Sequence, residues 1–438
     1  MKPFHSIIEL LHTSDFVEYS GEITSIGQRG IVASGPLCSV GDMCRIGRGE
    51  NAPLAEVVAV DNSSIRLLPL GPLERILPGT RLYRSDVHST FRSGSGFAGR
   101  AVDAFGNPID GGPPLRVAAH VARATPDAMK KTIERQRVAT GLRAIDALLP
   151  IAKGQRIGIF AASGVGKTTL IEQLSNHIDC DHVVVCLIGE RGREVERFWS
   201  MHQGGPRRER VTLIAATSDE SASVRVRAMH QALTICEHWR AAGEHVVLFV
   251  DSVTRLAMAL REIGLAAGEP PAVQSYTPNV FAALPGLIER CGAIKGGGAI
   301  TAILTVLSET DDVDDPIVET MKAILDGHIV LSRKLAEKGH FPAIDIAASV
   351  SRIADQVLDQ PTRAAATALK RSFAEYEESR AMIESGIYKA GSNQTIDRAI
   401  ALQPRIAQFV RQDRPTSADL TEVDASLAQS VAMDLANA

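Results

Sequence analysis

The chain has 438 residues, of which 45% are hydrophobic and 22% charged, and these values exclude a disordered or collagen-like protein. The 47 basic and 51 acidic residues give a net charge of −4, so no global basic field is available for a nucleic-acid backbone. Aromatic residues make up only 4%, which argues against a stacking surface for single strands. The six cysteines form no C-x-x-C pair and no apolar run approaches the roughly 18 residues of a membrane span, so we expect reduced thiols in a cytosolic protein.

The first 90 residues contain two predicted segments. Residues 1–17 place apolar side chains at the spacing i, i+3, i+4, i+7, which predicts an amphipathic helix. This helix either folds onto its own domain or docks on a partner or a membrane surface. Residues 18–90 predict a small closed or sandwiched β domain, because Gly, Pro, Asn and Asp separate short apolar segments. These segments are 21–26, 30–34, 52–60, 65–70 and 80–83.

The rest of the chain changes from alternating strands and helices to helices alone. Residues 91–135 are rich in Gly, and we expect a connector there. Continuous apolar runs follow at 156–160, 183–188, 211–216, 246–250, 300–307 and 328–331, with helical stretches such as 219–242 between them. Such runs are typical of strands buried on both faces, so we predict a doubly wound α/β core with a mainly parallel sheet. Residues 361–438 predict a helical C-terminal domain, whose tail after Asp413 either forms a last helix or frays.

The strongest local motif is AASGVGKTTL, from Ala161 to Leu170, between an apolar strand and a helical pattern. In this context a glycine-rich loop binds phosphate, because its N–H groups and the helix N-terminus converge on one anion. We expect Lys167 to reach the β- and γ-phosphates and the Thr168 hydroxyl to ligate Mg²⁺. Ala161 departs from the generic motif, which has Gly at this position. The predicted nucleotide-binding residues of the loop are Ala162, Ser163, Gly164, Val165, Gly166, Lys167, Thr168 and Thr169.

Two further strand ends supply charged residues. Asp251 would hold Mg²⁺ through water, because it ends an apolar run at the edge where open α/β sheets bind ligands. A helix cap is the alternative for this residue. Glu190 ends another run and is the predicted general base that orients and deprotonates the attacking water, with a surface salt bridge as the alternative. Arg191 and Arg255 are both candidates for a contact with the γ-phosphate, and charge and position do not rank them.

Five segments together resemble the type III export ATPases of the bacterial flagellum and the injectisome, relatives of the catalytic subunit of rotary ATP synthases. They are TGLRAIDALLPIAKGQRIGIFA, GERGREVERFW, DSVTRLAMALREIG, GEPPAVQSYTPNVFAALPGLIERCG and ILDGHIVLSRKLAEKGHFPAIDIAASVSR. The resemblance covers roughly residues 20–412. It implies an N-terminal β-barrel, a RecA-like P-loop core and a C-terminal helical domain, in a homohexameric ring with nucleotide sites between subunits. The expected boundaries are 1–17 for the N-terminal helix, 18–90 for the barrel, 91–360 for the ATPase domain with its entry connector 91–135, and 361–438 for the helical domain and tail.

The resemblance also implies roles for single residues. Arg352 in SVSR resembles an arginine finger that is supplied to the nucleotide of the neighbouring subunit. Phe341 occupies the position of an aromatic residue that packs on adenine, and Arg255 would lie near the γ-phosphate. Ala162 stands where the family commonly has Gly. The acidic loop 309–316 would lie near the central pore, where it would meet a basic stalk protein; a solvated surface loop is the alternative.

The implied function is a motor that hydrolyses Mg-ATP to energise type III protein export, releasing chaperones from cargo and unfolding the cargo. The implied partners are a stator-like regulator at the N-terminal region, a basic central stalk protein, export chaperone–substrate complexes and, peripherally, a membrane export gate. No specific nucleic acid is expected, and the implied location is the cytoplasm, at the inner face of the bacterial membrane.

Three alternatives stay open. A transcription-termination RNA helicase would need aromatic and basic residues in its barrel, where this chain offers only Tyr19 and Tyr83 as aromatics. A rotary ATP synthase subunit would use nearly the same chemistry, although that family lacks the sequence motifs GERGRE and RAIDALLP. A non-catalytic nucleotide-binding scaffold would not need Glu190 and Arg352 beside Lys167 and Asp251.

Overall fold

The structure is a computed structural model that describes residues 19–27, 29–49, 52–72, 76–85, 91–115, 119–121, 125–132, 136–205, 207–308, 315–413 and 416–435. The helix predicted at 1–17 and most of the acidic loop, residues 309–314, lie outside these ranges. The chain forms two compact units. The first comprises Met1–Phe91, Asp219–Val226 and Met258–Val280, and the second comprises Arg92–Ser218, Arg227–Ala257 and Phe281–Ala438.

The first unit contains a closed six-stranded β-barrel, which confirms the prediction for this part of the chain. Its strands are β1 (Ser20–Gly27), β2 (Gly30–Ala33), β3 (Met43–Ile46), β4 (Leu54–Val60), β5 (Ile65–Pro69) and β6 (Arg81–Ser85). All neighbours pair antiparallel in the order β1-β2-β5-β4-β3-β6, and β6 pairs back onto β1. Ile31, Leu67 and Leu82 fill the interior from different strands. The strand β3 was not predicted, because its four residues lack an alternating pattern long enough to recognise.

The second unit is built on a ten-stranded, mostly parallel sheet whose main path runs β20-β19-β13-β18-β16-β14-β15-β8. The long strands are β13 (Arg156–Ala161), β14 (His182–Glu190), β15 (Val211–Thr217), β16 (His245–Asp251), β18 (Ala299–Leu307), β19 (Gly327–Leu331) and β20 (Ile344–Ser351). On the main path only β20 pairs antiparallel, with β19. Almost every residue of β14, β16 and β18 is buried, which explains their continuous apolar sequence and confirms the predicted α/β core.

The segment predicted as a connector contributes short strands. β8 (Ala101–Val102) extends the sheet beside β15, and β10 (Lys131–Thr132) pairs with β17 (Gly292–Ile294), which itself pairs with β18. Two small sheets join β7 (Phe91–Ser93) to β9 (Ala119–Val121) and β11 (Arg137–Val138) to β12 (Ile151–Ala152). The connector is therefore partly integrated into the α/β core.

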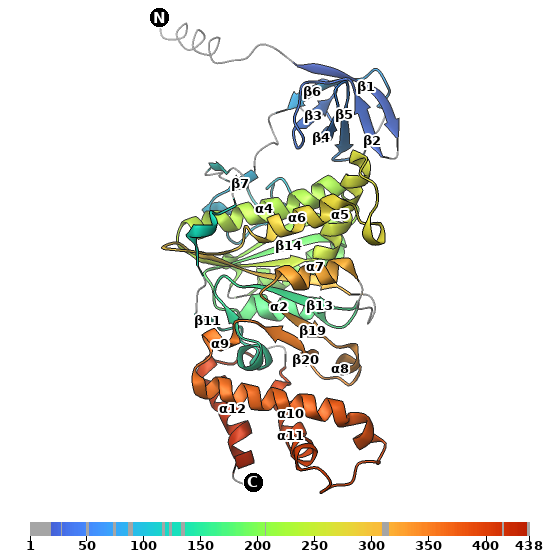
Figure 1. Ribbon diagram of the computed structural model, residues 1–438. Coiled ribbons are helices and arrows are strands. Elements are labelled where there is room, and N and C mark those ends of the chain that lie inside the picture. Colours follow the sequence, from blue (N-terminus) through green and yellow to red (C-terminus); the bar gives the residue numbers. More distant parts are fainter. Residues whose placement is uncertain are drawn as a thin grey trace, which may run out of the picture. The chain divides into compact units, whose positions relative to one another are not determined.

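Helices cover both faces of the sheet. The helices that lie between the strands in the sequence, up to Val357, are α2 (Lys167–His177), α3 (Gly192–Gln203), α4 (Ala222–Ala241), α5 (Val253–Ala267), α6 (Pro278–Ile288), α7 (Pro316–Ile324), α8 (Arg333–Glu337) and α9 (Ala354–Val357). Connections between parallel strands are right-handed, so the observed strand order places α2 and α3 on one face and α4, α6 and α7 on the other. Figure 1 shows α2 and α4 on opposite sides of the sheet.

The C-terminal region is helical, as predicted, and consists of α10 (Gln360–Glu384), α11 (Gln394–Val410) and α12 (Leu420–Leu435). Leu369, Phe409 and Leu427, one from each helix, belong to the same hydrophobic cluster as the buried strands of the sheet. The tail after Asp413 therefore forms a last helix. Within the described part of the chain, no helix combines the length and the apolar character that crossing a membrane requires.

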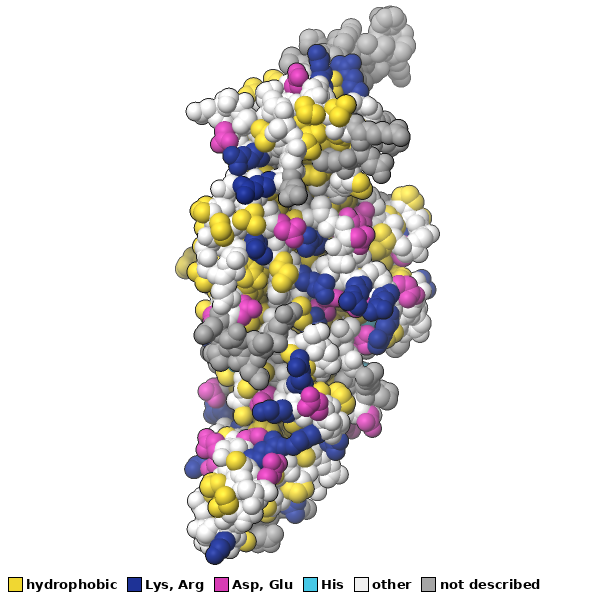
Figure 2. Space-filling model, turned by 90° about the vertical axis from the view of Figure 1, so that its right-hand side faces the viewer, with side chains coloured by type: hydrophobic (Ala, Val, Ile, Leu, Met, Phe, Trp, Pro, Cys, Tyr) yellow, Lys and Arg dark blue, Asp and Glu magenta, His cyan; other side chains and the backbone are white. Residues whose placement is uncertain are grey.

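All six cysteines lie in described ranges and carry free thiols. On the face drawn in Figure 2, Lys and Arg side chains form small groups that alternate with acidic, apolar and uncharged atoms.

Candidate active site

Three parallel strands deliver the predicted phosphate-binding and catalytic residues to one edge of the sheet. The strand β13 ends at Ala161 and leads into the phosphate loop, β14 ends at Glu190, and β16 ends at Asp251. Leu187 of β14 pairs with Asp251, so these two strand ends lie in register. The carboxyl ends of parallel strands meet at one edge, which is where ligands bind in this class of sheet.

The phosphate loop has the backbone that its glycines permit. Gly164 has φ of 78° and Gly166 has φ of 103°, and Gly166 is the residue from which α2 begins. Among the described non-glycine residues only Gln274 and Ser275 have positive φ, so Ala162 has an ordinary backbone conformation. Ala161 is paired with Leu307 inside the sheet. The two departures from the expected motif therefore impose no left-handed strain on alanine.

Lys167 lies between two acidic side chains at this edge. Its ammonium group donates to Asp251 Oδ1 and lies 3.8 Å from Glu190 Oε1. Asp251 is only 2% exposed, and the Thr305 hydroxyl donates to the same Oδ1 at 2.8 Å. Thr305 was not among the predicted site residues, although it is a polar residue inside an apolar strand run. The helix-cap alternative for Asp251 does not describe these contacts, which are those of a buried strand-end carboxylate held by a cation and a hydroxyl.

Glu190 is buried, with 6% of its surface exposed, and its two oxygens have different surroundings. Its Oε2 lies 3.3 Å from Arg255 Nη2, whereas its buried Oε1 accepts no hydrogen bond from the described residues. Burial raises the pKa of Glu190 to about 7, and the neighbouring carboxyl groups of Glu194 and Asp251 add to this effect. A carboxylate with a pKa near neutrality and a free acceptor oxygen has the properties of a general base.

The structure separates the two candidate arginines. Arg255 pairs with Glu190 and donates to the Gly189 carbonyl, so it lies within the cluster. Arg191 is exposed at the start of α3. In the phosphate loop Ser163 and Thr168 are exposed, Thr169 is half-buried, and Val165 packs into the core.

The oxygen ligands at this edge suit a hard divalent cation. The exposed Thr168 hydroxyl lies on the first turn of α2, and the Asp251 carboxylate lies at the neighbouring strand end. Mg²⁺ prefers oxygen ligands and keeps several waters, so one hydroxyl, one carboxylate and substrate phosphates are a fitting set. Among the described residues there is no cluster of three or more His, Cys, Asp or Glu that could hold a metal ion with protein ligands alone.

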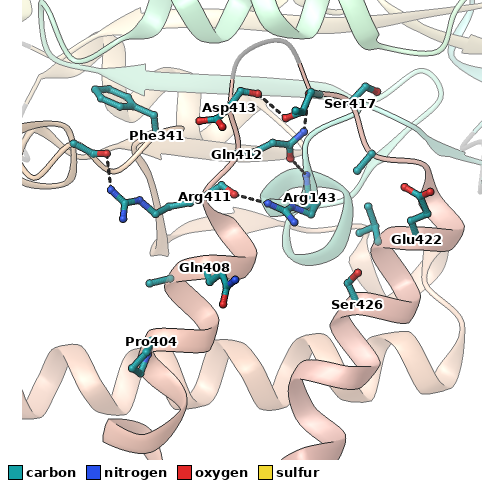
Figure 3. A pocket seen from close by; sticks show the side chains of 15 residues that line it. Arg143, Phe341, Pro404, Gln408, Arg411, Gln412, Asp413, Ser417, Glu422 and Ser426 are labelled. Atoms are coloured by element: carbon teal, nitrogen blue, oxygen red, sulfur yellow. Dashed lines mark hydrogen bonds between the residues drawn. The ribbon is translucent and has the colours of Figure 1, made fainter.

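A cavity of about 880 Å³ opens beside Phe341, between the carboxyl end of α11 and the amino end of α12 (Figure 3). A Cβ atom placed on Gly166 would lie 3.9 Å from Phe341 Cε1, so the ring lies next to the phosphate loop. Gln412 holds the adjoining segment in place. Its backbone N–H donates to the Phe341 carbonyl at 3.0 Å, and its Nε2 donates to the Gly141 carbonyl at 2.6 Å. Gln412 was missed from the sequence, because these contacts join segments far apart in the chain.

Arg352, the predicted arginine finger, lies away from this cluster. The preceding Ser351 pairs with Gly327, which pairs with Ile157 near the start of β13. The phosphate loop begins beyond the other end of that strand, roughly 13 Å along it at about 3.3 Å per residue. Arg352 Nη2 instead donates to the Lys322 carbonyl at the end of α7, at 3.1 Å.

Comparisons with known proteins agree with this architecture. Residues 141–351 match the nucleotide-binding domain of the ATP synthase alpha/beta family, and residues 358–429 match the T3SS EscN ATPase C-terminal domain. The flagellum-specific ATP synthase of Bacillus subtilis (strain 168) is 40% identical over 427 residues, covering 96% of this chain and 97% of the relative.

Two solved structures of a secretion ATPase are also similar. The assembled ATPase EscN of the enteropathogenic E. coli type III secretion system is 39% identical, with a TM-score of 0.88 over 94% of this chain and all of the other. The same ATPase in complex with its central stalk EscO is 38% identical, with a TM-score of 0.84 over the same shares. The chain therefore belongs to the family of flagellar and type III secretion ATPases, and it is an export ATPase.

Proposed function

We propose that this ATPase acts as a homohexameric ring in which two subunits complete each nucleotide site, and that it hydrolyses Mg-ATP to release chaperones from export cargo and unfold the cargo. One observation carries the proposal: Lys167, Glu190 and Asp251 meet at one edge of the sheet, whereas Arg352 lies at the other. A second subunit that presents its Arg352 edge to this cluster would complete the site. The assembled form of the similar ATPase EscN supports a ring.

Within one subunit, Lys167 and the N–H groups of the phosphate loop bind the β- and γ-phosphates. Thr168 and Asp251 would hold Mg²⁺, which would supply positive charge to the phosphate oxygens. Glu190 Oε1 accepts the proton of the attacking water, while Arg255 holds Oε2 and keeps the carboxylate in position. The cavity beside Phe341 receives the adenine base, with the ring as an apolar platform.

The neighbouring subunit supplies Arg352 to the charge that develops on the transferring phosphoryl group. Such an arginine is worth roughly 10³–10⁵ in rate. Arg352 needs no contact with its own phosphate loop for this role, and its exposed side chain is available to a second chain.

The proposal extends to partners and location. A basic central stalk protein, a stator-like regulator at the N-terminal region, export chaperone–substrate complexes and a peripheral contact with the membrane export gate are the expected partners, at the cytoplasmic face of the bacterial membrane. The EscN–EscO complex of the similar ATPase supports the stalk. The alternating acidic and basic groups of Figure 2 favour protein partners over the backbone of RNA.

The test is complementation in mixed rings. Arg352→Ala and Lys167→Ala are each expected to be inactive alone, and a ring containing both should recover hydrolysis where Lys167 of one subunit faces Arg352 of the other. Random mixing at equal ratio makes about a quarter of the interfaces intact. Arg371→Ala, which changes an exposed arginine on α10, is the control and should keep full activity. Mixed rings that form but stay inactive at every ratio would refute the shared site.

A further inference from the structure

The segment that carries Arg352 is held by a salt bridge at the start of β13. Arg156 Nε lies 3.0 Å from Asp326 Oδ2, and Arg156 Nη2 lies 3.0 Å from Asp326 Oδ1, which is a bidentate pair. Two further hydrogen bonds join these residues. The Arg156 N–H donates to Asp326 Oδ2 at 2.9 Å, and the Asp326 N–H donates to the Arg156 carbonyl at 2.9 Å. This geometry is stronger and more directional than that of an ordinary surface ion pair.

Asp326 in turn fixes the backbone of Arg352. The Arg352 N–H donates to the Asp326 carbonyl at 3.2 Å, and Gln155 Nε2 donates to the same oxygen at 3.3 Å. The Asp326 carboxylate raises the pKa of Arg156 above its usual range, which agrees with a tight pair. The salt bridge therefore sits one hydrogen bond away from the residue that we propose as the arginine finger.

We infer that Asp326, clamped by Arg156, is a positioning residue for Arg352 in the nucleotide site of the neighbouring subunit. The inference rests on the proposed shared site. An arginine finger stabilises the transition state only when its guanidinium is held close to the productive geometry, because small misplacements cost large factors in rate. The exposed Arg352 has few other restraints: its side chain donates to the Lys322 carbonyl, and its backbone depends on Asp326.

The expected effect of Asp326→Ala is a fall in kcat of roughly 10- to 100-fold with KM for ATP nearly unchanged, because the residues that bind the substrate lie at the other edge of the sheet. Arg156→Lys should give a smaller fall in kcat, since a lysine makes a single contact with the carboxylate in place of the two that the guanidinium makes. Glu289→Ala is the matched control. It removes the other acidic partner of Arg156 but leaves the pair with Asp326, so its kcat should stay within about twofold.

The decisive measurement shows whether the Asp326→Ala substitution impairs the nucleotide site of its own subunit or that of the neighbouring subunit. In mixed rings, Asp326→Ala should be complemented by Lys167→Ala to the same extent as Arg352→Ala is, because the intact site takes Lys167 from one subunit and a well-held Arg352 from the other. If Arg352→Ala is complemented and Asp326→Ala is not, Asp326 acts within its own subunit and the inference is wrong while the shared site stands. If neither is complemented, the shared site itself is wrong. Loss of kcat in Glu289→Ala equal to that in Asp326→Ala would also overturn the assignment.

A second, independent observation concerns the barrel, where two cysteines lie side by side. Cys38 Sγ lies 3.6 Å from Cys44 Sγ. Cys44 is buried in β3, whereas Cys38 is half-buried in the segment between β2 and β3. The other four cysteines, Cys180, Cys186, Cys236 and Cys291, are buried, and burial raises the pKa of each of these thiols.

We propose that Cys38 and Cys44 form an oxidisable dithiol that closes to a reversible disulfide when the protein meets hydrogen peroxide. The Cys38 thiolate takes one oxygen from peroxide, which gives a sulfenic acid and hydroxide. The Cys44 thiol then attacks the Cys38 sulfur, so that the S–S bond forms, the S–O bond breaks and water leaves. The hydrogen bond from Cys44 and the charge of Arg84 lower the pKa of Cys38, which favours its thiolate as the first group to react.

The experiment treats the full chain with hydrogen peroxide, then denatures it and alkylates the remaining thiols. We expect two fewer alkylated cysteines, a cross-linked peptide that contains Cys38 and Cys44, and recovery of all six thiols after reduction with dithiothreitol. Cys44→Ser should instead leave a Cys38 sulfenic acid that dimedone traps, and Cys180→Ser, the control, should still lose two thiols. Six alkylated cysteines after treatment, or a cross-link between other cysteines, would overturn the proposal.

Discussion

Glu190→Gln isolates the proposed proton-transfer step, because glutamine keeps the shape of the side chain and cannot accept a proton. Oε1 accepts no hydrogen bond from the described residues and lies 3.8 Å from the Lys167 ammonium group, while Oε2 is held by Arg255. The binding groups Lys167, Thr168 and Asp251 stay intact. We expect Mg-ATP to bind with nearly unchanged affinity and single-turnover hydrolysis to fall by roughly 10²–10⁴-fold.

The pH dependence of the unaltered enzyme follows from the same residue. With its pKa at about 7, Glu190 is largely protonated at pH 6 and largely ionised at pH 8. The single-turnover rate should therefore rise by about tenfold between these two values, because only the ionised form accepts a proton. Glu194→Gln removes a neighbouring carboxyl group that raises this pKa, so the midpoint of the profile should move to lower pH.

Stability gives a readout that does not depend on activity. The folded state raises the pKa of Glu190 from 4.5 to about 7, so it favours the protonated side chain. The resulting stabilisation is present below about pH 4.5 and is lost as the pH rises through about 7. Glu190→Gln should therefore have a higher Tm than the unaltered chain at pH 8, with the difference shrinking toward pH 5. A flat single-turnover profile from pH 6 to 8, or Glu190→Gln turnover within tenfold of the unaltered enzyme, would refute the base assignment.

Three other predictions follow from the site and the proposed ring. Lys167→Ala should lose binding of a fluorescent ATP analogue, because no other side chain neutralises the β- and γ-phosphates inside the loop, and unchanged affinity would contradict this role. Phe341→Ala should raise KM for ATP by about three- to tenfold while Phe341→Tyr leaves it nearly unchanged, since either ring offers an apolar face; equal KM values in both variants would argue against base stacking. Specific activity should rise with protein concentration over the range where sizing shows monomers becoming rings, whereas a constant value there would contradict a site shared between subunits.

Much of the fold could be predicted because its strands carry a strong signal. The central strands are buried on both faces, so their apolar runs are continuous and their predicted bounds lie within about two residues of the observed ones. The strand β3 was missed, since it has only four residues. The strand β20 was also missed, because its sequence IDIAASVS alternates between buried and exposed positions and contains no apolar run.

The candidate site was predictable for a related reason. Glu190 and Asp251 each end a buried parallel strand and Lys167 follows one, and the ends of such strands meet at one edge whatever the details of packing. Gln412 has no comparable signal. Its contacts with Phe341 and Gly141 depend on how α11 ends and on the path of the segment that follows it, and no local pattern encodes this arrangement.

The direction of β20 decides where Arg352 lies. The resemblance of SVSR to a known motif assigned Arg352 a role but not a position relative to Lys167. Had β20 run parallel to β19, its carboxyl end would lie at the same edge as the phosphate loop, and Arg352 could act in its own subunit. Because β20 runs antiparallel, Ser351 returns to the start of β19 and leaves Arg352 beside Asp326. A single reversed edge strand thus separates the proposed finger from the phosphate loop of its own chain, which makes its proposed action in trans a consequence of the sheet topology.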